Sequence, residues 1–300
     1  MKTLLIGNFG AQNIGDELIL SSALEDYPDC IVMTADSEYS QNFTEKKFET
    51  VPFVPIGVRS WLKFIFSSAY RDQIFSLNKK CVQVVFPGGG LFAIKFRACL
   101  LWFFIFLWIR FLLPDKKIIF QHQGVDKNLS WLSRKMTAFV FSRTDEISVR
   151  DEASREAVRD LCGKDVPNTH DRVERYLSTY FQHSEAQKET MVLVNSKRRW
   201  RSGALKEQFP HHKKIFIALH KKDLRFVSDS SFFDDVVFPR NKTALLNLFQ
   251  RSSFVVGMRF HSLLLGYHFC SNDKTFVLGA PYSEKVKNFV AEKGISQISS

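Results

Sequence analysis

The chain has 300 residues, of which 45% are hydrophobic and 24% charged, a composition that excludes a disordered or low-complexity protein. The formal net charge of +11 favours anionic partners such as phosphorylated substrates or acidic membrane surfaces. The basic residues form no continuous stripe with interleaved aromatic residues, so we expect no nucleic-acid binding. Five widely spaced cysteines without a CxxC pair argue against a disulfide framework and a structural zinc site.

The chain begins with a short apolar run at residues 4–6, and polar residues follow closely. The run is too short for the hydrophobic region of a signal peptide, so it predicts a buried strand instead. Together with the cysteine usage, this favours a cytoplasmic protein.

Short runs typical of β-strands alternate with helical patterns along most of the length, which predicts an α/β fold with parallel sheets. The first half is expected to contain strands at Thr3–Gly7, Ile31–Thr34, Val82–Phe86, Lys117–His122 and Glu146–Val149, with a weaker candidate at Thr50–Val54. Its expected helices are Ile14–Glu25, Leu91–Leu113, Leu129–Phe141 and Glu152–Leu161.

A second alternating series follows a polar stretch at residues 178–189. Its expected strands are Met191–Asn195, Lys214–Leu219, Asp235–Phe238, Phe254–Gly257 and Thr275–Leu278, and its expected helices are Lys242–Arg251, His261–Phe269 and Ser283–Glu292. Two consecutive α/β halves predict two Rossmann-like domains, residues 1–178 and 179–300, that face one cleft. Ligands bind beyond the carboxyl ends of strands in such sheets, so site residues are expected in the turns there.

One segment is apolar throughout from Ala98 to Ile109, and its apolar character continues past Arg110 to Leu113. As a helix, residues 98–113 would be about 24 Å long, shorter than the ~30 Å hydrocarbon core of a bilayer. A helix that is apolar on all sides is either buried or in contact with lipid. The nearby segment from Trp61 to Phe66 and the flanking Lys95, Arg97, Arg110, Lys116 and Lys117 fit docking on acidic lipid. Three interpretations remain open: peripheral contact with the inner face of the cell membrane, a buried core helix, and a true span.

The first expected strand ends in a glycine-rich turn from Gly7 to Gly15, followed by Asp16 and Glu17. Glycines permit a ligand to approach the backbone closely, and the free N–H groups of the following helix favour an anion. The turn lacks dinucleotide-binding spacing, and no Walker lysine follows it. The two carboxylates either contact a ligand or supply first-turn charges that match the helix dipole.

Two further turns of the first half combine glycines with polar side chains. Gly89 and Gly90 belong to a triple-glycine turn after the third strand, which again indicates close backbone approach. Gln123 and His122 end the fourth strand, where amide and imidazole groups can orient a hydroxyl. A purely structural role for the histidine is the alternative.

Arg150 stands where the fifth strand gives way to a helix, with Asp151 placed to cap that helix. An arginine there can bind phosphate or carboxylate through two hydrogen bonds, or it can pair structurally with Asp151 or Asp145. Downstream, Thr169-His170-Asp171 is expected to close another short strand.

The second half has its clearest signal at the turn after Val255-Val256-Gly257, where Arg259 and His261 stand at the start of a helix. A helix N-terminus favours an anion, the arginine can bind it, and the histidine can supply a proton near neutral pH. Tyr282 and Lys285, at the start of the last helix, are further candidates for the same site.

Taken in chain order, these motifs resemble the polysaccharide pyruvyl transferase family. The matching segments cover roughly residues 3–294 and are GNFGAQNIGDE, PGGGL, QHQG, VRDEAS, THD, GMRFHSLLLG and APYSEKVKNF. The resemblance implies a GT-B-like pair of Rossmann domains with phosphoenolpyruvate held between them. It also implies a saccharide acceptor, either free or lipid-linked.

On this resemblance, Arg150 and Arg259 are expected to neutralise the phosphate and carboxylate, and His261 to protonate the enol methylene. Asp16 is expected to accept the proton of the attacking sugar hydroxyl, after which a second hydroxyl closes a cyclic ketal. No metal or other cofactor is expected, because the arginines supply the positive charge. The remaining substrate-binding candidates are Gly15, Gly89, Gly90, Gln123, Tyr282 and Lys285.

The chain departs from the family pattern at two turns. Phe92-Ala93-Ile94 replaces a segment that often carries an acidic residue, and Val125-Asp126 stands where a second glycine is usual. Acceptor identity therefore stays open. Two other hypotheses also stay open: a GT-B-type glycosyltransferase that uses a nucleotide sugar, and a non-catalytic scaffold attached to a membrane through residues 98–113.

Overall fold

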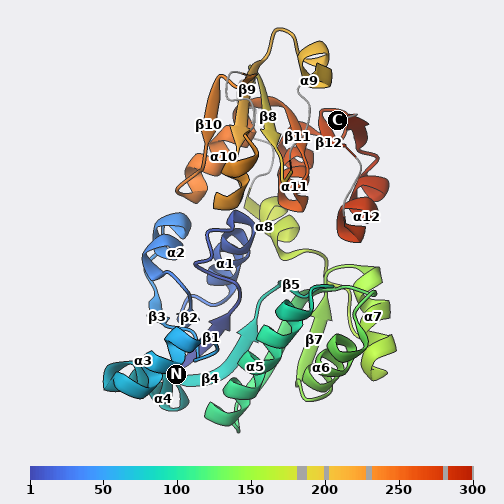
Figure 1. The fold of residues 1–300 in the computed structure, drawn as a ribbon. Helices are drawn as coiled ribbons and strands as arrows, with labels where there is room; N and C mark the ends of the chain where they lie inside the picture. The colour runs from blue at the N-terminus through green and yellow to red at the C-terminus, as the bar shows by residue number, and fades with distance from the viewer. Residues whose placement is uncertain (181–187, 199–202, 228–231, 280–282, 299–300) are drawn as a thin grey trace. The chain divides into compact units, whose positions relative to one another are not determined.

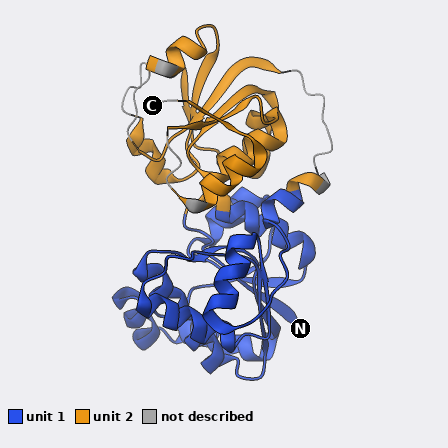
Figure 2. Ribbon diagram, turned by 90° about the vertical axis from the view of Figure 1, so that its right-hand side faces the viewer, with its two compact units in different colours: residues 1–11, 16–176 blue, residues 12–15, 177–300 orange. Residues whose placement is uncertain are grey.

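The computed structural model describes residues 1–180, 188–198, 203–227, 232–279 and 283–298. The chain forms two compact units (Figure 2). Unit 1 contains Met1–Ala11 and Asp16–Tyr176, and unit 2 contains Gln12–Gly15 and Leu177–Ser300. Each unit has its own parallel sheet flanked by helices (Figure 1) and its own hydrophobic core.

The sheet of unit 1 has seven parallel strands in the order β3-β2-β1-β4-β6-β5, and β7 also pairs with β6. Such strands are nearly continuous apolar runs because both faces of a parallel sheet are covered; every residue of β2 is buried. The strands are β1 (Lys2–Ile6), β2 (Cys30–Met33), β3 (Glu49–Val51), β4 (Cys81–Phe86), β5 (Gly89–Phe92), β6 (Lys117–Val125) and β7 (Glu146–Val149).

Four helices around this sheet begin at a side chain that caps their first turn: Asp36, Ser67, Ser130 and Asp151. Asp151 accepts a hydrogen bond from Ser154 N at 2.7 Å, which confirms it as the cap of α7. The helices are α1 (Ile14–Asp26), α2 (Ser37–Thr44), α3 (Val58–Phe66), α4 (Ser68–Lys80), α5 (Phe96–Leu112), α6 (Trp131–Ser142), α7 (Glu152–Cys162) and α8 (Arg172–Tyr180), and the division between the units falls within α1 and α8.

The sheet of unit 2 has six parallel strands in the order β10-β9-β8-β11-β12-β13. The strands are β8 (Glu189–Asn195), β9 (Lys213–Ile217), β10 (Asp235–Val237), β11 (Ser252–Gly257), β12 (Thr275–Leu278) and β13 (Ser296–Ile298). The helices are α9 (Gly203–Gln208), the 3-10 helix η1 (Lys221–Phe226), α10 (Lys242–Arg251), α11 (Phe260–Cys270) and α12 (Glu284–Lys293). Two parallel sheets of this kind confirm the predicted α/β class with two Rossmann-like halves.

Two predicted elements of the first half are wrong. The helix expected from Leu91 begins only at Phe96, because Gly89 (φ 105°) has a backbone that a helix excludes and the chain pairs with β6 through Phe92. The strand expected to end at residues 169–171 is an isolated bridge from Asn168 to Val149, since the chain turns at residue 170, whose φ is 60°.

The apolar segment at residues 98–113 forms α5, which has one face in the core of unit 1. That face contains Cys99, Trp102, Ile105, Phe106, Ile109 and Leu112. The opposite face reaches solvent at Phe104 and Phe111, whose exposed fractions are 44% and 71%. Within the described ranges, no helix is long and apolar enough to cross a membrane.

Alanine substitutions on the two faces of α5 should therefore differ sharply in their effect on stability. Phe106→Ala leaves a cavity under a fully buried ring and is expected to lower the free energy of unfolding by about 3–5 kcal/mol. Phe104→Ala removes the same ring from a half-exposed position and is expected to cost less than about 1 kcal/mol. Urea unfolding followed by circular dichroism measures both; equal losses would contradict the assignment of the buried face.

Candidate active site

The carboxyl ends of the unit 1 strands bring Arg150 against a glycine of β6. A Cβ on Gly124 would lie 2.1 Å from both Cζ and Nη2 of Arg150, so only glycine leaves room for this guanidinium. Gly90 is also close to this guanidinium, because a Cβ on Gly90 would lie 3.9 Å from Nη2 of Arg150. The two glycine turns and the arginine, separate in sequence, therefore meet at one sheet edge.

Arg150 is held by carboxylates on either side. Its Nε donates to Asp151 Oδ2 at 3.2 Å, and its Nη1 lies 3.9 Å from Asp171 Oδ2. The pairing with Asp151 was one predicted alternative, whereas Asp145 pairs with Arg110 instead. With 10% of its side chain exposed, Arg150 is an oriented cation at a polar edge.

Asp16 lies at the same edge of unit 1. Its Oδ2 accepts a hydrogen bond from Asn8 Nδ2 at 2.8 Å, and its Oδ1 is 3.9 Å from the position of a Cβ on Gly89. Asp16 and Gly89, which follows β4, are thus neighbours.

Glu17 has neither of its predicted roles at the helix surface. Its side chain is fully buried, and Oε1 accepts the backbone N–H of Gly10 at 2.7 Å. Burial raises its pKa to about 8, because the charged form loses its hydration. The carboxyl group therefore ties the glycine-rich turn to α1.

Gln123 and His122 lie in the last part of β6 and tie it to neighbouring segments. Gln123 is fully buried, and its Nε2 donates to Phe86 O at 3.0 Å and Gln121 O at 3.1 Å. His122 Nδ1 lies 2.9 Å from His170 O, and burial lowers the pKa of this imidazole. The hydrogen bonds of both side chains are those expected of structural residues at this edge.

The carboxyl edge of the unit 2 sheet is organised around Arg259 and a fully buried carboxylate, Asp223. Arg259 Nε donates to Asp223 Oδ2 at 2.7 Å, and Nη2 donates to Oδ1, so the pair is bidentate. Among the described residues, Nη1 has no hydrogen-bond partner. The guanidinium is fixed along one side, and its other side stays available at the N-terminus of α11.

Backbone amides and an asparagine complete the shell around Asp223. Oδ2 accepts hydrogen bonds from Leu219 N at 3.2 Å and His220 N at 3.1 Å, and lies 3.4 Å from Asn195 Nδ2. Asn195 ends β8 and also donates to Ile217 O of β9. Three strand ends thus converge on one carboxylate, which the sequence analysis missed, although Asp223 is the only acid in the basic run from His220 to Arg225.

His261 lies against the glycine turn that begins α1. A Cβ on Gly15 would lie 2.1 Å from His261 Nδ1, so glycine is required there to admit the imidazole. Both residues belong to unit 2. Gly15 therefore has a steric role next to a predicted catalytic side chain.

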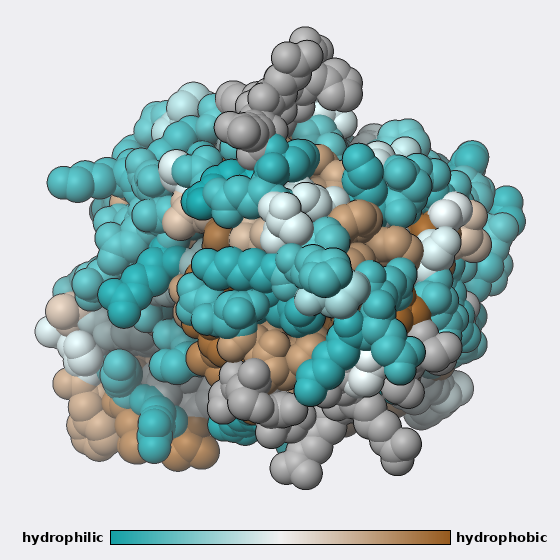
Figure 3. All heavy atoms as spheres, turned by 90° about the horizontal axis from the view of Figure 1, so that it is seen from above, coloured by the Kyte–Doolittle hydropathy of each residue, from teal (hydrophilic) through white to brown (hydrophobic). Residues whose placement is uncertain are grey.

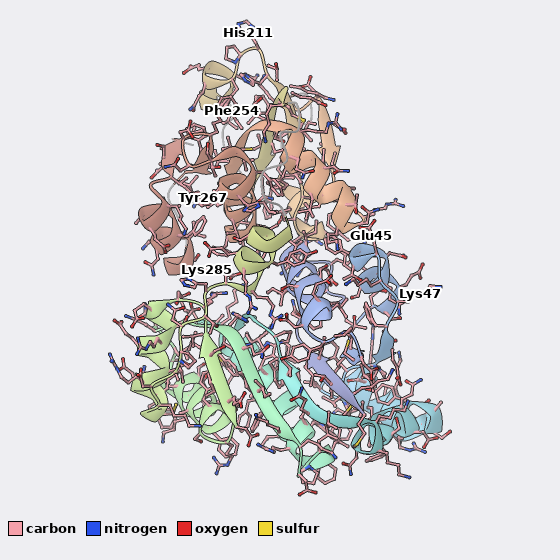
Figure 4. All side chains as sticks on the ribbon, turned by 180° about the vertical axis from the view of Figure 1, so that it is seen from behind. Glu45, Lys47, His211, Phe254, Tyr267 and Lys285 are labelled. Atoms are coloured by element: carbon pink, nitrogen blue, oxygen red, sulfur yellow. The ribbon has the colours of Figure 1, made fainter. Side chains whose placement is uncertain are left out.

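Two more unit 2 side chains, His220 and Lys285, lie close to Arg259 and to Phe260, respectively. His220, missed by the sequence analysis, has its pKa lowered by burial and by the nearby charge of Arg259. Lys285 lies in the first turn of α12 with Nζ 3.2 Å from the centroid of the Phe260 ring (Figure 4). Tyr282 lies outside the described residues.

An open pocket in unit 1 is lined by β6, β7 and residues 164–167, and none of the predicted site residues lines it. In the part of the chain that the structure describes, no three His, Cys, Asp or Glu side chains form a group that could hold a metal ion. The polar carboxyl edges of the two sheets are therefore the candidate sites.

Two Rossmann-like units with polar carboxyl edges place the chain in the GT-B-like class, and solved structures agree. HepE of Anabaena, in complex with UDP and glucose, is 14% identical with a TM-score of 0.57, covering 100% of this chain and 85% of that one. The UDP-GlcNAc 2-epimerase of Methanocaldococcus jannaschii is 10% identical with a TM-score of 0.59, covering 100% and 89%. That of Neisseria meningitidis, bound to UDP-GlcNAc, is 12% identical with a TM-score of 0.56, covering 99% and 87%.

These identities show a shared fold alone, and no curated protein matches the sequence. The sequence profile of the polysaccharide pyruvyl transferase family, however, matches residues 13–270. The chain belongs to the polysaccharide pyruvyl transferase family, which confirms the resemblance. It is an enzyme of that type, a polysaccharide-modifying transferase that acts on a saccharide acceptor.

Replacing Glu17 with glutamine is expected to change how stability depends on pH. The pKa is about 8 in the folded protein, whereas an unfolded glutamate titrates near ~4.3. The folded state retains the proton of Glu17, and this retention adds to the free energy of unfolding. The added stability is fully present below about pH 4 and declines as the pH rises toward 8, by up to ~1.4 kcal/mol per pH unit.

Urea unfolding between about pH 5 and about pH 8 should therefore show that the free energy of unfolding of Glu17→Gln declines less steeply with pH than that of the wild type. Glu38→Gln, at an exposed position of α2, is the matched control and should keep the wild-type pH dependence. Parallel curves for Glu17→Gln and the wild type would contradict a buried, proton-retaining carboxyl.

Proposed function

We propose that this enzyme transfers a pyruvyl group from phosphoenolpyruvate to a saccharide and forms a cyclic ketal. Family membership supports the reaction type, and the arrangement around Arg259 supports an anionic donor. Phosphoenolpyruvate carries a phosphate and a carboxylate, both of which match the planar donor geometry of arginine.

The observation that carries the proposal is the fixed orientation of Arg259. Asp223 occupies Nε and one edge of the guanidinium, so the arginine needs no reorganisation before it binds an anion through Nη1. The N–H groups that open α11 add positive potential at the same place. Arg150, oriented by Asp151 and Asp171, is the corresponding anion-binding candidate of unit 1.

In the proposed reaction, His261 protonates the methylene carbon of the enol, which leaves an electrophilic C2. A sugar hydroxyl attacks C2 while Asp16 accepts its proton. The bond from C2 to the phosphate oxygen then breaks, and inorganic phosphate leaves with that electron pair. A second hydroxyl closes the ketal, so the two hydroxyl protons balance the new methyl C–H and the departing phosphate.

The other substrate-binding candidates fit this proposal because they either leave space for a reactive side chain or add a polar or charged group. Gly15 admits His261, and Gly89 and Gly90 border the carboxylate of Asp16 and the guanidinium of Arg150. Gln123 ties the part of β6 that carries Gly124 to Phe86 of β4, and Lys285 brings a further positive charge to Phe260. Tyr282 stays a prediction from the sequence.

For the acceptor, we propose a saccharide linked to a lipid at the inner face of the cell membrane. The net charge of +11 and the exposed apolar face of α5 support a substrate at an anionic membrane surface. The nucleotide-sugar alternative rests on the bound UDP of structures that share only the fold.

Purified protein with phosphoenolpyruvate and a panel of saccharides, free and lipid-linked, is expected to release inorganic phosphate. Arg259→Lys and His261→Asn should each lower the rate by at least about a hundredfold, because one loses the bidentate geometry and the other the proton donor. Arg251→Lys, at an exposed position of α10, is the matched control and should keep the wild-type rate.

Thermal unfolding supplies the test against the rival donor. Phosphoenolpyruvate should raise the midpoint of the wild type and not that of Arg259→Lys. Stabilisation by UDP-sugars but not by phosphoenolpyruvate would contradict the proposed donor and favour a glycosyltransferase.

Asp223→Asn is expected to impair the donor site by loosening Arg259. The amide has a similar size but no charge, so the free energy of unfolding should fall by about 1–3 kcal/mol and the KM for phosphoenolpyruvate should rise at least about tenfold. Asp235→Asn, at an exposed end of β10, is the control.

A double-mutant cycle separates positioning from general destabilisation. If Asp223 acts through Arg259, adding Asp223→Asn to Arg259→Lys should cost little further activity. Fully additive losses would mean that Asp223 has no specific role in orienting Arg259.

A further inference from the structure

Helix α3 presents its apolar stripe to solvent instead of to the core. Val58, Trp61, Leu62 and Ile65 recur at the i, i+3, i+4, i+7 spacing of one helical face, and all four are exposed, Ile65 to 57%. None of the nine residues of α3 is buried. A surface helix of a folded domain normally turns such a stripe inward, so an outward stripe indicates a contact beyond the chain itself.

Phe64 anchors α3 from its other side. Its ring lies 5.5 Å from that of Trp108 on α5 and 6.4 Å from that of Tyr70 on α4. Trp61 also contacts Trp108, with ring centroids 5.6 Å apart, and Trp108 contacts Phe111 at 5.9 Å. The exposed stripe of α3 and the outer face of α5 therefore form one continuous surface.

We call this surface the α3–α5 patch and define it by the exposed Trp61, Leu62, Ile65, Phe104 and Phe111 and the half-buried Trp108, all of unit 1. In the view of Figure 3 the surface is largely hydrophilic, and hydrophobic residues show both in its middle and at its lower-left edge. An apolar area of this kind that is not part of the core requires an explanation.

The charges around the patch identify its partner. Arg59 and Lys63 are exposed on α3, and Arg97 is exposed at the start of α5. Neither helix contains an aspartate or a glutamate. A second copy of the chain would place like charges against one another, whereas an anionic surface would neutralise them.

We propose that the α3–α5 patch docks unit 1 on an anionic lipid bilayer. Tryptophan and phenylalanine rings enter the boundary between headgroups and acyl chains, and the arginine and lysine side chains contact anionic headgroups. The structure divides the segment predicted to contact a membrane, residues 98–113, because the inner face of α5 belongs to the core. Its outer face and the exposed side chains of α3 supply the apolar surface. The proposal does not depend on which donor the enzyme uses.

Co-sedimentation of the full chain with vesicles tests the docking. Vesicles that contain phosphatidylglycerol should bind the protein, and Leu62→Ser/Ile65→Ser should weaken this binding at least about tenfold. Trp131→Ser/Leu132→Ser, which removes exposed apolar side chains from α6, is the matched control and should bind like the wild type. Circular dichroism should show that both variants fold, because none of the four residues is buried.

The electrostatic part is tested with Lys63→Glu and Lys47→Glu, which change the net charge equally. Lys47 lies at the periphery of unit 1 (Figure 4), outside the patch. Only Lys63→Glu should weaken binding strongly, and vesicles of phosphatidylcholine alone should bind the wild type poorly. Equal effects of the two charge changes would overturn the proposal. Concentration-dependent association that the Leu62/Ile65 variant abolishes, without vesicle binding, would also overturn it and make the patch a protein interface.

Discussion

The chemistry assigned to unit 2 depends on one buried ion pair, Asp223 with Arg259. A fully buried carboxylate is costly unless it is hydrogen-bonded and paired, and here two backbone amides, an asparagine and the guanidinium satisfy it together. The buried carboxylate of Asp223 needs a paired cation, and this pairing fixes the orientation of Arg259. Because the pair uses only one side of the guanidinium, the other side stays available for an external anion. The contact thus stabilises this sheet edge and, in the proposed function, also orients the arginine that binds the donor.

The sequence predicts the fold well wherever burial is unambiguous. Parallel strands such as β2 and β8 are largely apolar runs between turn residues, because the two faces of a parallel sheet are both covered by helices. The prediction fails where local pattern and tertiary structure diverge. The glycines at residues 88–90 precede Leu91, where the sequence predicts a helix start, and only pairing with β6 makes Gly89–Phe92 a strand. Helix α5 is apolar on every side, so its buried face is decided by α6 and the sheet rather than by its own residues.

For the candidate site, the sequence predicts which residue types stand at the strand ends, but it does not predict which side chains contact one another. Glycine turns, Arg150 and Arg259 are visible because glycine and arginine at strand ends have few ordinary roles. Asp223 is 36 residues from Arg259 in the chain, and no local pattern reveals that its carboxylate is buried beneath three strand ends. Glu17 is the reverse case: it looks like a surface charge at a helix start, and its burial under Gly10 appears only in three dimensions.

The most direct measurement is an experimental structure of the protein with phosphoenolpyruvate bound. The account predicts that an anionic group of the donor accepts a hydrogen bond from Arg259 at the N-terminus of α11, with the bidentate contact to Asp223 unchanged. Donor density remote from Arg259, or an arginine that leaves Asp223 in order to bind it, would contradict a preorganised anion site.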